Sequence, residues 1–237
     1  MDISIVTATL NSKRYLPALV ESLQNQTDKD FEWVIADGLS NDGTVEFIQS
    51  IQNLKMTILV EKDCGIYDAL NRAVREARGR YYLVLGSDDF LYPDAIKKFK
   101  EQIQNSSPAF IAAGLIVGQK RIMPKKNLGW LYGMAGVASS HSVGLLIRKD
   151  LHDTYGYYSS VLKITADQLF VKSVIKAKES IIRTRFISGR MAPDGFSSKN
   201  VLRFQMEFFL SQIQTERFKL LQILLFFLRL LKNYRSL

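Results

Sequence analysis

The sequence predicts an α/β fold in which a mostly parallel mixed sheet is flanked by helices. Two observations predict it. Short apolar runs rich in β-branched and aromatic residues recur at 3–8, 31–36, 56–60 and 81–85, as expected of strands covered on both faces. Segments with apolar residues at helical spacing separate these runs, and this alternation favours parallel strands joined by helical crossovers.

Three helices are predicted between these strands. In residues 14–26, the apolar positions 16, 19, 20 and 23 share one side of a helix. A second helix follows the turn before residue 44. A third, over 65–79, carries a single apolar stripe that ends at Gly79.

The alternation weakens from about residue 109. Residues 110–118 and 143–148 predict strands, and residues 167–179 predict a helix. A mixed sheet is therefore expected to continue here, followed by a helical appendage from about residue 199. The expected organisation is a domain over 1–198, with halves 1–90 and 91–198, and basic amphipathic helices over 199–237.

Composition fits one sizeable core. The chain has 237 residues, of which 47% are hydrophobic. Cys64 is the single cysteine, which excludes an internal disulfide and favours a reducing, cytoplasmic location. The first residues lack the basic and long apolar regions of a signal peptide, so none is expected.

The C-terminal segment is both basic and apolar. The net charge is 32 − 23 = +9, and residues 196–237 contribute +5 of it through seven basic and two acidic residues. The apolar run 220–231 contains Gln222 and Arg229 and is shorter than the roughly 20 residues of a membrane span. The segment is expected to lie on an anionic membrane surface, on its own domain, or on a second subunit in a homo-oligomer.

Polar clusters follow each of the first four strands, at the edge where such sheets bind ligands. No GxGxxG follows the first strand and no GxxxxGK[ST] occurs, which argues against a dinucleotide site and a P-loop. The cluster "DGLSNDGT" has two readings. Ser40 or Asp42 can cap a helix, and Asp37, at a strand end, can bind a nucleobase or ribose.

The segment "LVLGSDDF" carries adjacent carboxylates, Asp88 and Asp89, after a buried strand. Two such carboxylates repel unless a cation, donors or water compensate. Because Pro93 favours a helix start near Asp94, the pair is not needed as a cap. Mg²⁺ or Mn²⁺ would suit it, completed by substrate phosphate oxygens. The cysteine and two histidines show no zinc spacing.

The order and spacing of these motifs resemble the family 2 glycosyltransferases of the GT-A fold over about residues 2–195, in particular bacterial enzymes of O-antigen, capsule or colanic-acid synthesis. The resemblance rests on "SIVTATLNS", "FEWVIADGLSNDGT", "EKDCGIYDALNRAVREARGRYYLVLGSDDFLYPDAI", "SSHSVGLLIRKDL" and "ITADQLFV".

The resemblance implies donor-site roles in two groups. It places Thr7, Thr9 and Asn11 beside the nucleotide. Asp37 would contact the base, Asp88 the ribose or the metal, and Asp89 the metal that bridges the diphosphate. Lining the donor pocket it places Asp63, Asp68 and Asn71, for which helix capping is the alternative.

The same resemblance implies a general base and two further contacts. Asp167 would take the acceptor proton, with an ordinary helix N-cap as the alternative. His141 would contact donor phosphate or acceptor, or hydrogen-bond structurally; Ser142 follows it where the family usually has Gln. Arg190 would reach the diphosphate from a loop over 190–198 that closes on the donor, unless that loop is simply solvated.

The expected function is inverting, metal-dependent transfer of a hexose or related sugar from a nucleoside diphosphate donor. UDP is favoured over GDP, and the acceptor would be a saccharide on undecaprenyl diphosphate at the cytoplasmic face of the inner membrane. The alternative is a noncatalytic binding or assembly subunit with the same fold. A nucleic-acid partner is not expected, because the basic residues form no aromatic-interleaved patch.

Overall fold

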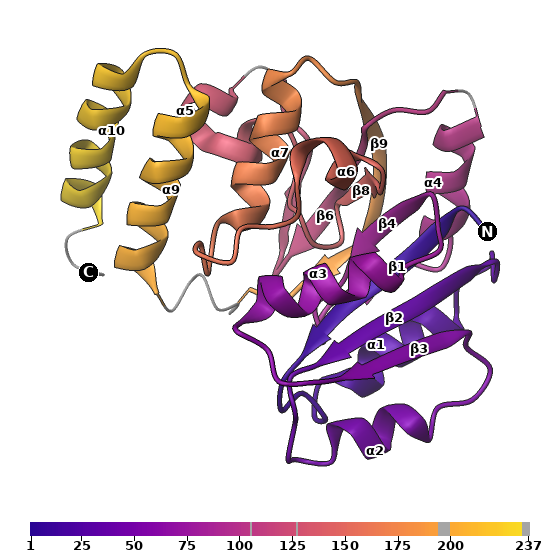
Figure 1. Ribbon diagram of the computed structural model, residues 1–237. Coiled ribbons are helices and arrows are strands. Elements are labelled where there is room, and N and C mark those ends of the chain that lie inside the picture. The colour runs from indigo at the N-terminus through magenta and orange to yellow at the C-terminus, as the bar shows by residue number, and fades with distance from the viewer. Residues whose placement is uncertain (105, 127, 194–199, 234–237) are drawn as a thin grey trace.

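The computed structural model describes residues 1–104, 106–126, 128–193 and 200–233. Within these residues nine strands form one mixed sheet in the order β3-β2-β1-β4-β8-β6-β9-β5, with β7 beside β6. Helices cover the sheet, and two C-terminal helices extend from one end of it (Figure 1). The predicted fold class is confirmed.

The first half of the sheet is parallel, as the sequence predicts. The strands are β1 (Ile3–Thr9), β2 (Phe31–Asp37), β3 (Met56–Val60) and β4 (Tyr81–Val84). The register pairs Thr9 with Asp37, and Asp37 with Val60. The carboxyl ends of the strands therefore meet at one edge, and their polar loops emerge side by side.

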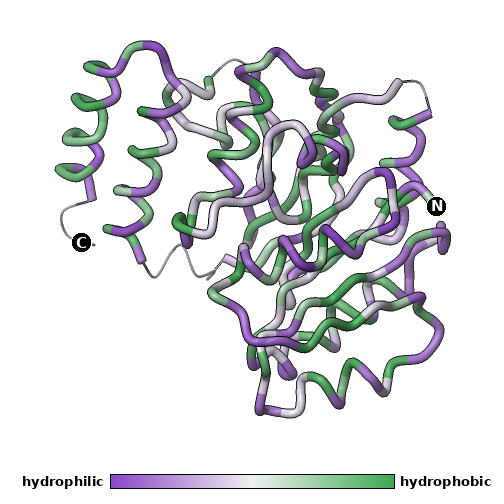
Figure 2. The backbone as a smooth tube through the Cα atoms, in the orientation of Figure 1, coloured by the Kyte–Doolittle hydropathy of each residue, from purple (hydrophilic) through white to green (hydrophobic). Residues whose placement is uncertain are grey.

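Helices on both faces bury these strands. On one face α3 (Ile66–Glu76) and α7 (Ala166–Lys176) pack in a core with Val6, Val34 and Tyr82. On the other, α1 (Leu16–Gln24) and α4 (Ala95–Gln104) pack in a core with Ile5, Trp33 and Leu83. Figure 2 shows hydrophobic residues concentrated on the central strands. Burial on both faces explains why these strands are apolar nearly throughout.

The remaining elements connect or extend these layers. They are α2 (Thr44–Gln49), β5 (Phe90–Leu91), β6 (Phe110–Val117), β7 (Lys120–Ile122), α5 (Gly129–Tyr132), η1 (Gly133–Gly136), β8 (Leu145–Arg148), α6 (Leu151–Tyr155) and β9 (Ile181–Met191). Strand β8 runs antiparallel to β4, and β9 lies between β6 and β5. Strand β9 was not predicted, and it places Arg190 in a strand rather than in a loop.

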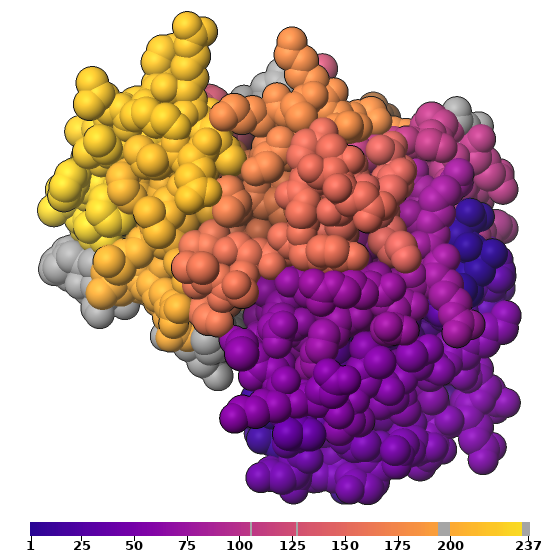
Figure 3. Space-filling view, viewed as in Figure 1, coloured from indigo at the N-terminus to yellow at the C-terminus, as the bar shows by residue number. Residues whose placement is uncertain are grey.

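The C-terminal segment forms a hairpin of α9 (Val201–Thr215) and α10 (Lys219–Lys232). Helix α9 packs against α7, and α10 packs against α9 with Phe226 stacked on Phe209 at 4.5 Å. The hairpin forms one end of the molecule, away from the N-terminal strands (Figure 3). Among the described residues, no helix is both long and apolar enough to cross a membrane.

Candidate active site

The turn after β2 is organised by the carboxylate of Asp37. One oxygen accepts from the Thr9 hydroxyl at 2.8 Å and the Ser40 hydroxyl at 2.7 Å, and the other accepts from the Ser40 backbone N–H at 2.7 Å. The side chain is fully buried. Asp37 thus holds the turn as well as the strand end, and contact with a nucleobase remains a prediction.

Asn11 lies in the loops at the sheet edge, whereas Thr7 lies in the core. Asn11, at φ +50°, accepts from the Asn41 N–H at 3.0 Å and donates its own N–H to Ser40, which joins the first two loops at the sheet edge. Thr7 is buried and accepts from the Trp33 indole at 2.9 Å. Because side chains alternate along a strand, Ala8 rather than Thr7 reaches the pocket described below.

Asp63 and Gly38 bring the second and third loops into contact. A Cβ on Gly38 would lie 2.3 Å from Oδ2 of Asp63, so only glycine allows this approach. Asp63 Oδ1 accepts from the Gly65 N–H at 3.0 Å, and Arg72 lies 3.9 Å from Oδ2. The donor-side candidates Asp63 and Asp37 therefore stand on neighbouring loops of one edge.

Asp68 and Asn71 both make structural contacts. Asp68 accepts from the Cys64 N–H at 3.0 Å, in the first turn of α3. The Asn71 amide donates to the Tyr158 carbonyl at 2.8 Å and accepts from the Tyr158 N–H at 3.0 Å. Asn71 is buried, and it fixes the segment before α7 to α3. A role of either residue in binding the donor remains a prediction.

The turn after β4 presents two unlike carboxylates. Asp88 is exposed, whereas Asp89 is buried and accepts from the Gly86 N–H at 2.6 Å and from the Ser142 hydroxyl. Burial, aided by the nearby charge of Asp88, raises the pKa of Asp89 to about 6 despite these donors. The turn therefore contains a carboxylate that is costly to leave charged without a cation.

This turn fits a hard divalent cation. A Cβ on Gly86 would lie 2.9 Å from Asp88 Oδ1 and 3.2 Å from Asp89 Oδ2, so both carboxylates fold over the bare glycine. Mg²⁺ and Mn²⁺ accept one or two protein carboxylates and complete their shell with water and phosphate oxygens. The described residues hold no cluster of three or more His, Cys, Asp or Glu, so the fit requires such external ligands.

A pocket of about 220 Å³ opens beside this turn. Its lining includes Gly86 of this turn together with Ser142, His141 and Asp167, and also Tyr67 and Lys163. Asp167 lies in the first turn of α7, where the N-cap position belongs to Thr165. The N-cap alternative for Asp167 is therefore wrong, and its side chain faces the pocket with 16% of its surface exposed.

Asp167 is held through one oxygen. Oδ1 accepts from the Tyr67 hydroxyl at 2.8 Å and from the Gln168 N–H at 2.7 Å. Oδ2 lies 3.8 Å from Nδ1 of His141, beyond hydrogen-bond distance. Among the described residues Oδ2 has no hydrogen-bond donor, and a carboxylate with one oxygen held and the other open is suited to accept a proton. The contact with Tyr67 was not predicted from the sequence.

His141 begins a buried chain of hydrogen bonds. Its Nε2 lies 2.7 Å from the Tyr158 hydroxyl, which contacts the Tyr82 hydroxyl, and Tyr82 lies 2.8 Å from Nε2 of His152. Burial lowers the pKa of His141, against the opposing charge of Asp167, and lowers that of His152 to about 4. Both histidines are therefore neutral near pH 7, and His141 has a structural partner while facing the pocket.

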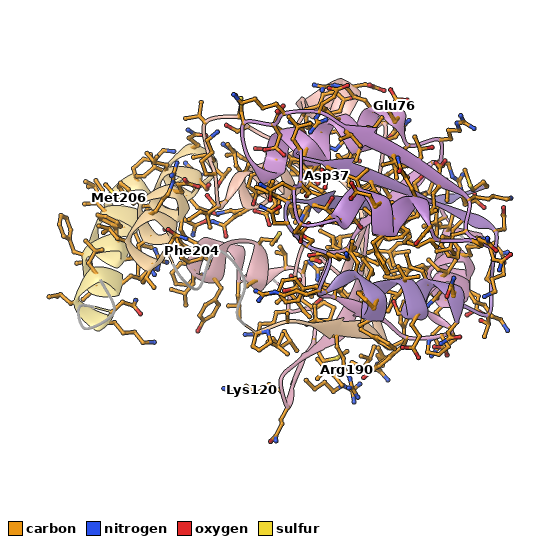
Figure 4. The ribbon with its side chains drawn as sticks, turned by 90° about the horizontal axis from the view of Figure 1, so that it is seen from below. Asp37, Glu76, Lys120, Arg190, Phe204 and Met206 are labelled. Carbon is orange, nitrogen blue, oxygen red and sulfur yellow. The ribbon has the colours of Figure 1, made fainter. Side chains whose placement is uncertain are left out.

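Arg190 is not brought to this pocket. Its Nε donates to the Tyr92 hydroxyl at 3.1 Å, and its backbone pairs with Phe90. Figure 4 shows Arg190 apart from Asp37. A contact with the diphosphate remains a prediction, and residues 194–198 of the predicted closing loop lie outside the described residues.

Comparison with known proteins agrees with this arrangement. Residues 4–138 match the family model "Glycosyl transferase family 2". A PGL/p-HBAD biosynthesis glycosyltransferase of Mycobacterium tuberculosis is 31% identical over 173 residues, which cover 69% of this chain and 66% of the relative. The match thus spans just under two thirds of that protein.

Two solved structures share the fold at low sequence identity. TarS 1–349 of S. aureus in complex with UDP has a TM-score of 0.70 at 18% identity, covering 100% of this chain and 72% of the other. The mannosyltransferase PcManGT of Pyrobaculum calidifontis, with GDP-Man and Mn²⁺, has a TM-score of 0.70 at 14% identity, covering 91% and 65%.

Proposed function

The chain belongs to glycosyl transferase family 2, and from this premise we propose that it transfers a sugar, with inversion, from a nucleoside diphosphate sugar to a lipid-linked saccharide. UDP is the favoured nucleotide. One observation carries the proposal. One pocket is lined both by Asp167, whose Oδ2 accepts no hydrogen bond from the described residues, and by Gly86, over which the Asp88 and Asp89 carboxylates converge.

Asp167 serves as the general base in this proposal. The acceptor hydroxyl oxygen attacks the anomeric carbon of the donor sugar, and its proton moves to the Asp167 carboxylate. The bond from the anomeric carbon to the diphosphate oxygen breaks, and its electron pair stays on the departing nucleoside diphosphate. Asp167 ends protonated. The neutral His141 beside it adds no cation that would oppose proton uptake.

The donor lies against the edge formed by the first four strands. Asp88 and Asp89 would hold Mn²⁺ or Mg²⁺, which when bound neutralises charge on the leaving diphosphate. Thr9 and Asp37 at the ends of β1 and β2, with Asn11 and Asp63 in the loops beside them, would support the nucleotide. Support for a bound metal comes from the raised pKa of the Asp89 carboxyl and from the archaeal structural relative that carries GDP-Man and Mn²⁺.

The orientation of helix α10 supports a membrane-bound acceptor, because polar side chains contact the protein while apolar side chains are exposed. Two polar residues in the middle of the helix contact the protein: Gln222 donates to the Trp130 carbonyl at 2.9 Å, and Arg229 to the Leu131 carbonyl at 2.7 Å. The residues facing outward are exposed and apolar: Leu220, Leu221, Ile223, Leu224, Phe227, Leu228 and Leu231. An exposed apolar stripe of this size marks a contact surface.

Charge favours an anionic membrane over a second copy of the chain. Arg217 and Lys219 lie at one end of the stripe and Lys232 at the other, and α10 contains no acidic residue. Pairing two such helices would bring like charges together, whereas anionic head groups would neutralise them. In this proposal α9 remains on its own domain and α10 lies on the cytoplasmic face of the inner membrane, close to a lipid-linked substrate.

The proposal is tested by measuring nucleoside diphosphate release from UDP-sugars and GDP-sugars with undecaprenyl diphosphate saccharides as acceptors. Asp167→Asn is expected to bind UDP with native affinity but to lose about 100-fold or more in transfer rate, because the proton has no base. Asp94→Asn, a control at an exposed ion pair with Lys98, is expected to retain activity. Near-native turnover by Asp167→Asn would place the base elsewhere.

A further inference from the structure

Tyr67 offers one proton to two acceptors. Its hydroxyl oxygen lies 2.8 Å from the Ile164 carbonyl and 2.8 Å from Oδ1 of Asp167. A phenol has a single O–H, so it can donate to only one of them at a time. Burial, with the charge of Asp167 as the second cause, raises the pKa of Tyr67 well above its ordinary value. The hydroxyl therefore keeps its proton under working conditions.

The two acceptors compete differently as the charge of Asp167 changes. An ionised carboxylate is a stronger acceptor than an amide carbonyl, so the hydroxyl favours Oδ1 when Asp167 is charged. Once Asp167 carries a proton, its Oδ1 becomes a weaker acceptor and the Ile164 carbonyl competes with it. The Gln168 N–H also donates to Oδ1, at 2.7 Å.

The carbonyl of Ile164 is itself fixed from the C-terminal hairpin. Glu207 of α9 accepts from the Ile164 N–H at 2.8 Å, the Thr165 N–H at 3.1 Å and the Lys163 N–H at 3.0 Å. This segment leads directly into the first turn of α7. The second acceptor for the Tyr67 hydroxyl therefore lies on a segment that cannot withdraw without breaking three hydrogen bonds.

We propose that Tyr67 is a positioning residue for the base: its hydroxyl holds Oδ1 of charged Asp167 so that Oδ2 takes the acceptor proton, and then turns to the Ile164 carbonyl. This inference rests on the proposed role of Asp167. The proton of the acceptor alcohol stays on Asp167, and the Tyr67 proton only changes its hydrogen-bond acceptor. No proton leaves Tyr67.

Other groups also face this carboxylate and define the background of any pH profile. His141 approaches from the segment before β8, and Lys163, which donates to the Cys64 carbonyl at 2.7 Å, lines the same pocket. Glu207 on α9 acts on Tyr67 through its charge, and Tyr158 contacts His141. These groups are unchanged in a Tyr67→Phe variant, which removes only the hydroxyl.

The experiment compares the pH–rate profiles of the wild type, Tyr67→Phe and Tyr81→Phe. Tyr81 is the matched control: it is fully buried and donates to the Pro108 carbonyl at 2.8 Å, away from the pocket. Tyr67→Phe is expected to lower kcat about 10- to 100-fold, the effect of one hydrogen bond to a charged group, with the donor KM unchanged. The low-pH limb of its pH–rate profile should move to higher pH, because the ionised Asp167 carboxylate has lost a hydrogen-bond donor.

The outcomes separate this inference from the proposed function. Loss of transfer in Asp167→Asn together with a native rate and profile in Tyr67→Phe would overturn the role of Tyr67 alone. If Tyr67→Phe does not fold, 3-fluorotyrosine at position 67 replaces it. Its more acidic hydroxyl is a stronger donor, so the low-pH limb should move to lower pH, and an unmoved limb would overturn the proposal.

Discussion

The Ser142 hydroxyl donates a hydrogen bond to Oδ2 of Asp89, which joins the segment before β8 to the turn after β4. The two residues are 53 positions apart in sequence. The contact orients the buried carboxylate of the proposed metal pair, and Ser142 also lines the pocket that contains Asp167. Ser142 therefore links the proposed donor side of the site to the proposed acceptor side.

Replacing Ser142 with alanine tests this link. Partners that orient a metal ligand commonly contribute 10- to 100-fold to metal affinity. Ser142→Ala is therefore expected to weaken Mn²⁺-dependent UDP binding about tenfold, measured by titrating Mn²⁺ at constant UDP. Ser50→Ala, which removes an exposed hydroxyl that donates to the Phe47 carbonyl at 2.7 Å, is the control. Equal affinities in the wild type and Ser142→Ala would show that this hydroxyl does not support the metal pair.

A substitution at Asn71 distinguishes a structural role of this residue from a role in binding the donor. In Asn71→Asp, a carboxylate oxygen replaces the amide nitrogen that donates to the Tyr158 carbonyl. The carboxylate oxygen and the carbonyl oxygen, both acceptors, then face each other without a hydrogen bond. We expect the free energy of unfolding to fall by about 2 kcal/mol. Asn53→Asp, in an exposed loop, should change it little. Native stability combined with lost UDP binding would instead make Asn71 a donor-pocket residue.

His152 makes stability depend on pH. Its pKa is lowered to about 4 by burial, while the Gly156 carbonyl and Asp153 favour the charged form and His141 and Arg75 oppose it. As the pH falls below about 6.5, His152 is protonated in the unfolded chain before it is protonated in the folded protein. Neutral His152 therefore contributes its full stabilisation above that pH, and the contribution decreases as the pH falls toward 4. Between pH 7 and pH 5 this residue alone is expected to lower the free energy of unfolding by about 2 kcal/mol.

Urea titrations at several pH values measure this loss. His152→Phe retains a ring that can stack on Tyr157 and Phe170, as the imidazole does at 4.8 and 4.4 Å, but it cannot titrate. The variant should lose less stability than the wild type over the same pH range, and the remainder comes partly from His141, whose pKa is lowered in the same direction. An identical slope in both proteins would contradict the assignment.

The exposed stripe of α10 is tested with vesicles. Leu224 and Leu228 are 57% and 51% exposed, and glutamate at both positions places two charges in the middle of the stripe. Binding to vesicles rich in phosphatidylglycerol should fall at least about tenfold, since burial of each leucine contributes more than 1 kcal/mol. The same change at Val161, which is 78% exposed on a loop, should have no effect. Unchanged vesicle binding by the double variant would contradict the membrane proposal.

Local patterns predicted the first half of the fold well, because each strand is buried on both faces and each helix has one apolar stripe. The strand over 56–60 was placed at its observed ends, and the third helix ends within a few residues of its predicted end. Strand β9 was missed because its residues are mostly half-buried and polar and apolar side chains mix along it, without the continuous apolar run that marks the central strands. Its pairing with β6 depends on distant contacts.

The sequence predicted which loops carry the candidate residues, but not the contacts between residues far apart in sequence. Asp89 lies in the turn after β4 and Asp167 lines the pocket, while their roles remain predictions, and nothing local in the sequence indicates that Tyr67 reaches Asp167 across 100 residues. Composition predicted an amphipathic tail, but only the packing shows that Gln222 faces inward and the leucines outward. Both features are set by tertiary contacts.

The most direct test of the central claim is calorimetric titration of UDP and of GDP into the protein, each with and without Mn²⁺, repeated on Asp89→Asn. One nucleotide, with UDP favoured, is expected to bind only when Mn²⁺ is present, and the variant is expected to lose this binding while keeping its fold. Absence of binding by either nucleotide in the wild type, or native Mn²⁺-dependent binding by Asp89→Asn, would contradict that claim.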